Sequence, residues 1–377
     1  MEFTLEVRNF RGLRRVEWTP SGVCAVVGPN GSGKTTLIDV LQLLSDAVSQ
    51  GFTKALEQHG GAYGLRHFEA PGDEPVVFGV RRGTVQWTFQ PEVSLGSGGA
   101  RVPFTEKFLK DDTVIFEQNR ESLSAGRHGS HLPDDRLFRH VPDELLLGTS
   151  KEDVLGLMSA MGGYRHHRHY SLPSLRSEGS RLSGDLALAK DGRNVFAVLM
   201  NWHNRRDQSE RWRFVTDNLR TCFPELMADF SFPIAANIVS CEVHTPRGDT
   251  LTPGLLPDGF LVMMIHLCAI ASTEEHSVVA VDEPENALHP FAIRQLVAAF
   301  REWSDKHDVT VLLATHSPVL LDTFKEHPEK VFVMEPGQEV LPVPLDKLKT
   351  RNWLAHFSLG DLYERLKFGA PTGVEEE

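Results

Sequence analysis

The octapeptide GPNGSGKT at residues 28–35 is the strongest structural signal in this chain. It matches the phosphate-binding pattern in which four variable residues separate a glycine from Gly-Lys-Thr. The apolar run at 22–27 predicts a strand before it, and the apolar spacing over 37–44 predicts a helix after it. Strand, glycine loop and helix in this order let backbone N–H groups approach phosphate oxygens closely. The pattern therefore predicts an α/β protein with a P-loop nucleotide site.

We expect this loop to bind ATP. Lys34 would reach the β- and γ-phosphates, and the Thr35 hydroxyl would complete the shell of a Mg²⁺ ion. Lys34 is therefore a candidate catalytic residue as well as a cofactor ligand. The expected nucleotide contacts in the loop are Asn30, Gly31, Ser32, Gly33, Lys34, Thr35 and Thr36.

The composition excludes several classes of protein. The 377 residues, 41% of them hydrophobic, suffice for one large α/β core with an inserted lobe, or for two domains. No run of eighteen apolar residues and no signal peptide is present, so we expect a cytoplasmic protein with no membrane partner. Four widely spaced cysteines fit neither a zinc site nor a disulfide scaffold. A net charge of −12 argues against a general polyanion binder.

The pattern along the chain predicts two halves of an ATPase lobe around an insertion. Residues 1–119 would form the first half, with hairpins over 3–18 and 76–89, a possible strand at 113–116 and a glycine- and serine-rich loop at 95–100. Residues 120–240 would form an inserted, basic and mainly helical lobe with helices at 195–203 and 210–222. Residues 241–377 would complete the ATPase lobe with helices at 260–272 and 290–306, strands at 277–281 and 309–314, and a frayed acidic tail at 373–377.

Two carboxylates directly follow the predicted strand at 278–281. Asp282 would hold Mg²⁺ through its shell, and Glu283 would polarise the attacking water. Taken alone, the pattern would also fit an acidic turn before the helix that begins at Pro290. Its combination with the phosphate loop favours the metal and catalytic roles.

A histidine ends the next predicted strand. His316 would reach the γ-phosphate from the side opposite Lys34, because the carboxyl ends of parallel strands meet at one edge of a sheet. Ser317 would serve equally as a helix N-cap, since Pro318 suits the first helical position.

Together these motifs resemble those of ABC-type ATPases of the RecF/SMC-like branch, and most closely the small AAA family ATPases of bacterial DNA repair and anti-phage systems that lack coiled coils. The resemblance implies a P-loop fold with a mixed sheet, ATP and Mg²⁺ as cofactors, and a nucleotide-linked homodimer. Further likeness at 191–195, 222–224 and 359–363 extends it over most of the chain. The motifs that carry it are 9–13, 28–35, 282–285 with 288–290, and 314–318.

In such ATPases a Leu-Ser-x-Gly signature from one subunit contacts the ATP of the other. The matching stretch is 256–259, in which Pro257 replaces the serine and removes a hydroxyl that the family uses. Asp258 and Gly259 remain at a helix start and would still contact the nucleotide. The resemblance therefore implies a dimer with slow hydrolysis, and 286–289 would cross its interface. The position of the glutamine loop stays open.

A basic stretch, YRHHRHY at 164–170, interleaves cations with aromatic rings. Such a run fits contact with double-stranded DNA or an acidic partner, a solvated loop, or a histidine metal site without acidic ligands. The candidate contacts are Arg165 and Arg168, together with Arg205 and Arg206 further along the chain.

Two functions of different classes remain open. One is an ATP-driven dimer switch that engages DNA or a partner effector in repair or anti-phage defence. The other is a scaffold that binds ATP, turns it over poorly and holds a toxin or nuclease inactive, which Pro257 and the acidic charge favour. A transporter subunit is disfavoured by the insertion, the altered signature and the motif at 9–12.

Overall fold

The computed structural model describes residues 2–71, 74–92, 102–120, 135–138, 141, 143–146, 150–335, 338–349, 354 and 358–366. The loop expected at 95–100 and the acidic tail expected at 373–377 lie outside these residues.

A six-stranded sheet forms the centre of the molecule. Its strands pair in parallel except for the antiparallel pair at the β18 edge. Runs of β-branched residues buried on both faces are typical of such a sheet. In spatial order the strands are β18 (Val343–Pro344), β17 (Val331–Val333), β3 (Val23–Val27), β16 (Thr310–Ala314), β15 (Val278–Asp282) and β8 (Arg165–His167).

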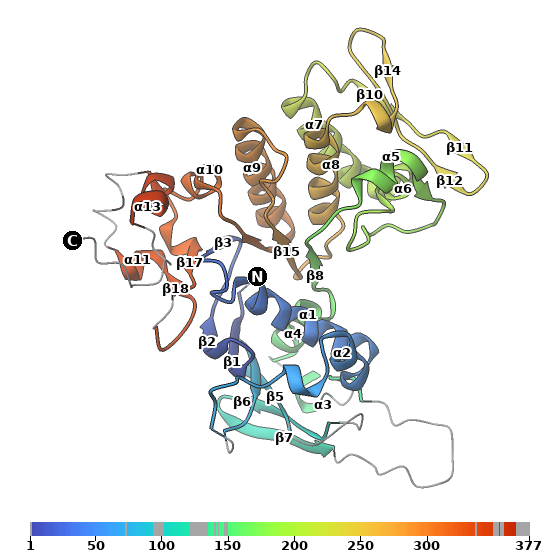
Figure 1. Cartoon of the computed structure of the whole chain (residues 1–377). Coiled ribbons are helices and arrows are strands. Elements are labelled where there is room, and N and C mark those ends of the chain that lie inside the picture. The colour runs from blue at the N-terminus through green and yellow to red at the C-terminus, as the bar shows by residue number, and fades with distance from the viewer. Residues whose placement is uncertain are drawn as a thin grey trace.

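A second six-stranded sheet is antiparallel throughout and lies beyond α1 (Figure 1). Alternating buried and open residues along β5 show that one face packs on the core. In spatial order its strands are β2 (Leu13–Trp18), β1 (Thr4–Phe10), β4 (Val77–Arg82), β5 (Val85–Pro91), β6 (Phe104–Lys110) and β7 (Thr113–Arg120).

The central sheet separates two hydrophobic cores. Alternate residues of β15 point to opposite faces, so that Val278 and Ala280 join the core shared with the antiparallel sheet, while Val279 and Val281 join the other. The first core contains α1 (Lys34–Gln50), α2 (Phe52–Gln58) and α4 (Lys151–Gly162). The second contains α6 (Val195–Asn204), α7 (Ser209–Cys222), α8 (Asp258–Ala271) and α9 (Pro290–His307).

Shorter elements complete the described chain. Two three-stranded sheets have the orders β10 (Asp229–Ser231), β13 (Glu242–His244), β14 (Thr250–Leu251) and β11 (Ile234–Ala235), β12 (Ile238–Val239), β9 (Ser180–Arg181). The remaining helices are η1 (Ala62–Gly64), α3 (Asp143–Leu146), α5 (Leu172–Glu178), η2 (Arg206–Gln208), η3 (Pro253–Leu255), α10 (Pro318–Asp322), η4 (Pro328–Lys330), α11 (Leu345–Leu348) and α13 (Leu359–Leu366). Within the described ranges, no helix has the length and apolar character needed to cross a membrane.

The predicted α/β fold class is confirmed, and the predicted hairpins, helices and core strands are present within two or three residues at most ends. The insertion is different from our expectation, because residues 120–240 do not form one separate lobe. Arg165–His167 forms strand β8 of the central sheet, and α4 packs against α1 (Figure 1). Only the later part of this segment, from α5 onward, lies with α8 on the other side of the sheet. Strand β6 and the two small sheets were not predicted from the sequence.

Candidate functional site

Most of the residues predicted for the phosphate loop meet the predicted carboxylates and His316 in one cleft. The phosphate loop connects β3 to α1. In the sheet β16 lies next to β3, and β15 lies next to β16, so the carboxyl ends of these parallel strands share one edge. A cavity of about 340 Å³ opens there. Its lining residues are Asn30, Gly31, Gly33, Lys34, Thr35, Thr36, Arg168, His169, Asp282, Glu283, Ala314 and His316.

The backbone of the phosphate loop requires its glycines. Gly28 has a φ of 153°, and a Cβ there would lie 2.6 Å from the carbonyl oxygen of Met334. Gly33 has a φ of 95° and forms the N-cap of α1 in the left-handed region. The loop therefore folds tightly into the start of α1, whose first N–H groups have no intrahelical partner and are suited to binding anions. Ser32 belongs to this loop but does not line the cavity, and its buried Oγ has no hydrogen-bond partner in the described part of the chain.

The ammonium group of Lys34 is held over the loop. Its Nζ donates to the carbonyl oxygens of Gly28 and Pro29, at 2.8 Å and 3.0 Å. Burial lowers the pKa of Lys34, while the nearby carboxylates of Glu283 and Asp282 oppose that shift. Lys34 is thus a partly desolvated cation that faces two carboxylates. This arrangement of charges suits a triphosphate, which would contact Lys34, together with a divalent cation, which would contact the carboxylates.

Asp282, at the end of β15, is nearly buried, with 9% of its side chain exposed. Its Oδ2 lies 3.4 Å from both Arg168 Nε and His166 Nε2. Its buried Oδ1 has no hydrogen-bond partner among the residues described. An unpartnered carboxylate oxygen in the same cavity as the Thr35 hydroxyl fits the oxygen ligands that Mg²⁺ prefers.

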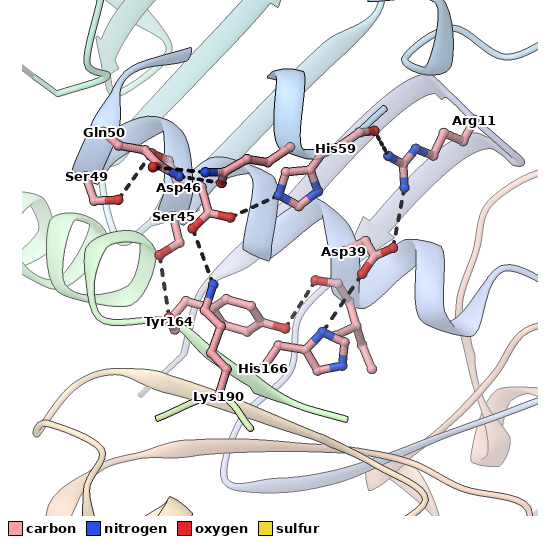
Figure 2. A network of polar contacts seen from close by, with 12 residues as sticks. Arg11, Asp39, Ser45, Asp46, Ser49, Gln50, His59, Tyr164, His166 and Lys190 are labelled. Carbon is pink, nitrogen blue, oxygen red and sulfur yellow. Dashed lines mark hydrogen bonds and ion pairs between the residues drawn. The ribbon is translucent and has the colours of Figure 1, made fainter. Parts of the chain in front are cut away.

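A polar network continues from Asp282 into α1. His166 is 8% exposed, and its Nδ1 lies 3.9 Å from Asp39 Oδ1. Asp39 in turn lies 3.4 Å from Arg11 Nη1, and Arg11 also donates to the carbonyl oxygens of His59 and Gly64. Figure 2 shows His166 and Arg11 on either side of Asp39. The motif at 9–13 is therefore joined to the nucleotide cleft through α1.

The turn after β15 holds Glu283 at the cavity edge. Glu283 has a φ of 48°, its N–H donates to the Ala314 carbonyl at 2.8 Å, and its Oε2 accepts from Asn286 Nδ2 at 2.8 Å. A non-glycine residue in the left-handed region is a strained position that often marks function. This turn leaves the Glu283 side chain exposed toward solvent beside Lys34 and His316.

Glu285, for which the sequence predicted no role, connects this turn to the loop that bears His316. Its Oε1 accepts hydrogen bonds from the Thr315 hydroxyl at 2.8 Å and from the His316 N–H at 3.1 Å. Burial raises the pKa of Glu285. Nothing in the spacing of the motif distinguished Glu285 from a solvated residue, because its partners come from the neighbouring strand.

His316 lies at the cavity with its ring held from behind. Its Nδ1 is 2.8 Å from the hydroxyl of Tyr363 in α13, an orientation that leaves Nε2 for the cleft. Burial, and then the Lys34 cation, lower the pKa of His316, while Glu283 opposes the shift. Ser317 Oγ accepts from Leu320 N at 3.3 Å, so this serine is the N-cap of α10.

The signature residues lie outside this cavity. Asp258 and Gly259 begin α8, whose N-cap is Pro257. Arg176 Nη2 lies 2.6 Å from Asp258 Oδ1 and donates to the Leu256 carbonyl at 2.7 Å. A Cβ on Gly259 would lie 2.8 Å from the Ala287 carbonyl, so α8 begins against the loop after Glu285. Contact of these residues with the nucleotide of a second subunit stays a prediction.

The four arginines proposed for nucleic-acid contact are not brought together. Arg168 lines the nucleotide cavity, Arg165 is half-buried on β8, and the exposed Arg205 and Arg206 follow α6. The run at 164–170 is thus partly core, because His167 is fully buried and burial lowers its pKa to about 3. No group of three or more metal-ligating side chains occurs among the described residues, there or elsewhere.

Comparison with known proteins fits this geometry. A family model described as "AAA domain, putative AbiEii toxin, Type IV TA system" matches residues 23–322, from β3 to the end of α10. The chain belongs to this AAA family. The matched range includes the phosphate loop, both carboxylates and His316, and it confirms the resemblance predicted from the sequence.

One curated protein and two solved structures are similar to most of this chain. The OLD nuclease of Thermus scotoductus is 23% identical over 336 residues, which cover 84% of this chain and 59% of the relative. The chain thus spans about three fifths of the length of that curated relative. An SMC head bound to the C-winged helix domain of ScpA is 14% identical, with 92% of this chain and 99% of that chain covered and a TM-score of 0.47. The SMC head domain from Thermotoga maritima is 12% identical, with 88% and 94% covered and a TM-score of 0.39.

Proposed function

We propose that the protein binds and hydrolyses ATP with Mg²⁺ and uses the nucleotide to control a homodimer that engages DNA or a partner effector in DNA repair or anti-phage defence. The observation that carries the catalytic part is the single cleft in which Lys34, Asp282, Glu283 and His316 meet. The family and the OLD nuclease relative support the class of ATPase. The dimer, the DNA and the effector rest on the sequence motifs.

Each residue of the cleft has a defined task. The N–H groups of the loop and of the start of α1 hold the phosphates, and Lys34 leaves the Gly28 and Pro29 carbonyls to contact them. Thr35 and Asp282 would hold Mg²⁺, which neutralises the charge that develops on the phosphates when it is bound. Glu283 orients a water for in-line attack, and neutral His316 donates from Nε2 toward the γ-phosphate.

Exposed residues beside the signature support the dimer. Leu255 is 67% exposed immediately before the signature stretch, and Phe291 is 46% exposed at the start of α9. In the sequence, Leu255 comes shortly before α8, and Phe291 comes shortly after the Ala287 loop against which α8 begins. Apolar side chains around a helix N-terminus suit a surface that a second copy covers when its nucleotide reaches Asp258 and Gly259.

The switch is tested by comparing wild type with Lys34→Ala. We expect ATP to increase both the dimer fraction in light scattering and the affinity for double-stranded DNA, with neither change in the variant. If wild type forms the dimer but binds no DNA, the proposal that the dimer engages DNA is contradicted, and control of a partner effector remains. An ATP-independent oligomer in both proteins would contradict the switch.

A second function, an ATP-bound scaffold that holds a nuclease or toxin inactive, is favoured by the start of α8. Pro257 has no hydroxyl, and the Asp258 carboxylate already forms an ion pair with Arg176. Both features weaken the contribution of a signature to the transition state. Because the described residues hold no cluster of metal ligands apart from the cleft carboxylates, cutting would come from the partner. This function is supported if wild type binds ATP tightly with negligible turnover and Pro257→Ser restores turnover.

A further inference from the structure

We propose that Arg168 is a phosphate-contacting residue of the nucleotide cleft that also serves as the counter-ion of Asp282, so that Arg168 and Mg²⁺ compete for the same carboxylate. This inference rests on the proposed function. It assigns a nucleotide-binding role to a residue that the sequence indicated only as a candidate contact for DNA or an acidic partner.

The register of the sheet places Arg168 at the cleft. In the parallel pair β8 and β15, His167 lies opposite Val281, which brings Arg168 to the level of Asp282 at the carboxyl end. Side chains alternate along a strand, and the buried His167 points into the core. His166 and Arg168 therefore share the other face, and both lie 3.4 Å from Asp282 Oδ2.

The exposure of the two partners differs in a way that suits competition. Asp282 is 9% exposed, so its charge needs a compensating cation. The side chain of Arg168 is 50% exposed and lines the same cavity as Lys34 and Thr35. A guanidinium has five N–H donors, and with Nε facing Asp282 its Nη groups remain able to donate to phosphate oxygens.

The arrangement predicts a specific dependence on Mg²⁺. Without Mg²⁺, Arg168 is the cation between the Asp282 carboxylate and the phosphates of ATP. With Mg²⁺, the metal supplies that positive charge, and the contribution of Arg168 decreases. Loss of Arg168 should therefore weaken binding of metal-free ATP more than binding of Mg-ATP.

The test is calorimetric titration of the full chain with ATP, in Mg²⁺ and in EDTA. For Arg168→Ala we expect the Kd in EDTA to rise about ten- to a hundredfold, the range for loss of a charge-assisted hydrogen bond, and the Kd in Mg²⁺ to change no more than about threefold. Arg168→Lys, which keeps the charge, should lose less. Arg165→Ala, at the start of β8 and outside the cavity lining, is the matched control and should behave as wild type.

Asp282→Asn completes a double-mutant cycle. Because the role of Arg168 depends on the Asp282 charge, Arg168→Ala should cost less affinity in EDTA in the Asn background than in the wild type. If Arg168→Ala loses ATP affinity equally in Mg²⁺ and in EDTA, or loses none in either, the inference is overturned. The proposed function is unaffected in that case, provided that wild type binds Mg-ATP. Wild-type binding in Mg²⁺ but not in EDTA would also overturn the inference. Absence of Mg-ATP binding in wild type would refute the proposed function itself. If the alanine variant does not fold, Arg168→Gln, which also removes the charge but keeps a long polar side chain, gives the same readout.

Discussion

Glu285→Ala should destabilise the protein and slow hydrolysis, because this carboxylate links the turn that bears Glu283 to the loop that bears His316. Alanine removes the acceptor of two hydrogen bonds, from the Thr315 hydroxyl and the His316 N–H. Thr315 is fully buried, so its hydroxyl proton loses its acceptor without access to water, although the hydroxyl oxygen still accepts from the Ser317 N–H. His316 borders the cavity, and its N–H is more easily hydrated.

The magnitude follows from these two donors and one offset. A buried donor left without a partner costs about 1–3 kcal/mol, which applies in full to Thr315 and in part to His316. Removal of a carboxylate whose burial raises its pKa recovers part of that cost. We expect a net loss of about 2 kcal/mol in the free energy of unfolding for Glu285→Ala.

Glu285→Gln separates the hydrogen bonds from the charge. Glutamine keeps an acceptor oxygen but does not ionise. In wild type, burial raises the pKa of the Glu285 carboxyl above 4.5 in the folded state. The folded state therefore binds more protons than the unfolded state, and the free energy of unfolding falls as pH rises from 4.5 through the raised pKa. Glu285→Gln lacks this slope and should gain stability relative to wild type over that window.

Urea unfolding followed by circular dichroism between pH 4.5 and 7 measures both effects, with the exposed Glu326→Ala as control. The reasoning is refuted if Glu285→Ala matches Glu285→Gln in stability at pH 7 and both hydrolyse ATP at the wild-type rate.

Three further predictions concern the loop, the histidine and the core. Gly28→Ala should lower both the yield of folded protein and ATP affinity, because its Cβ would lie 2.6 Å from a backbone carbonyl; thermal melts and ATP titration check this. Tyr363→Phe should lower kcat several-fold with little effect on ATP Kd, because the ring of His316 loses the partner of its Nδ1; unchanged kcat would contradict that role. Burial lowers the pKa of His167 and of His266 to about 3, so the unfolded state binds more protons than the folded state between pH 6.5 and 3. The free energy of unfolding should therefore fall as pH decreases through that range. An acid titration monitored by fluorescence would contradict this if stability stayed level.

The parts of the site that the sequence predicted are contiguous motifs. Residues 28–35 contain both the glycines and the lysine of the loop, so a single stretch specifies the strand, the turn and the helix start. Asp282 and Glu283 likewise stand directly after a strongly apolar strand, a pattern that indicates a core strand with carboxylates at its end. Their meeting in one cleft follows from the order of parallel strands.

The parts that the sequence did not predict depend on distant partners. β8 reads Arg-His-His, a polar run that resembles a solvated loop, and it becomes a strand because it pairs with β15. Propensity is overridden here by tertiary contacts, since His167 is enclosed by the core on one face and His166 and Arg168 meet Asp282 on the other. The position of Arg168 in the nucleotide cleft was not predicted for the same reason.

The most direct test of the central claim is steady-state ATP hydrolysis of wild type and Glu283→Gln, with ATP binding measured on both and double-stranded DNA present or absent. If the cleft at the ends of β3, β15 and β16 is the catalytic centre, wild type hydrolyses ATP in a Mg²⁺-dependent reaction. Glu283→Gln should then bind ATP with similar affinity and lose about a hundredfold or more in turnover, as expected for removal of a general base. Equal turnover in the two proteins would contradict the account, because the hydrolysis would then come from another site.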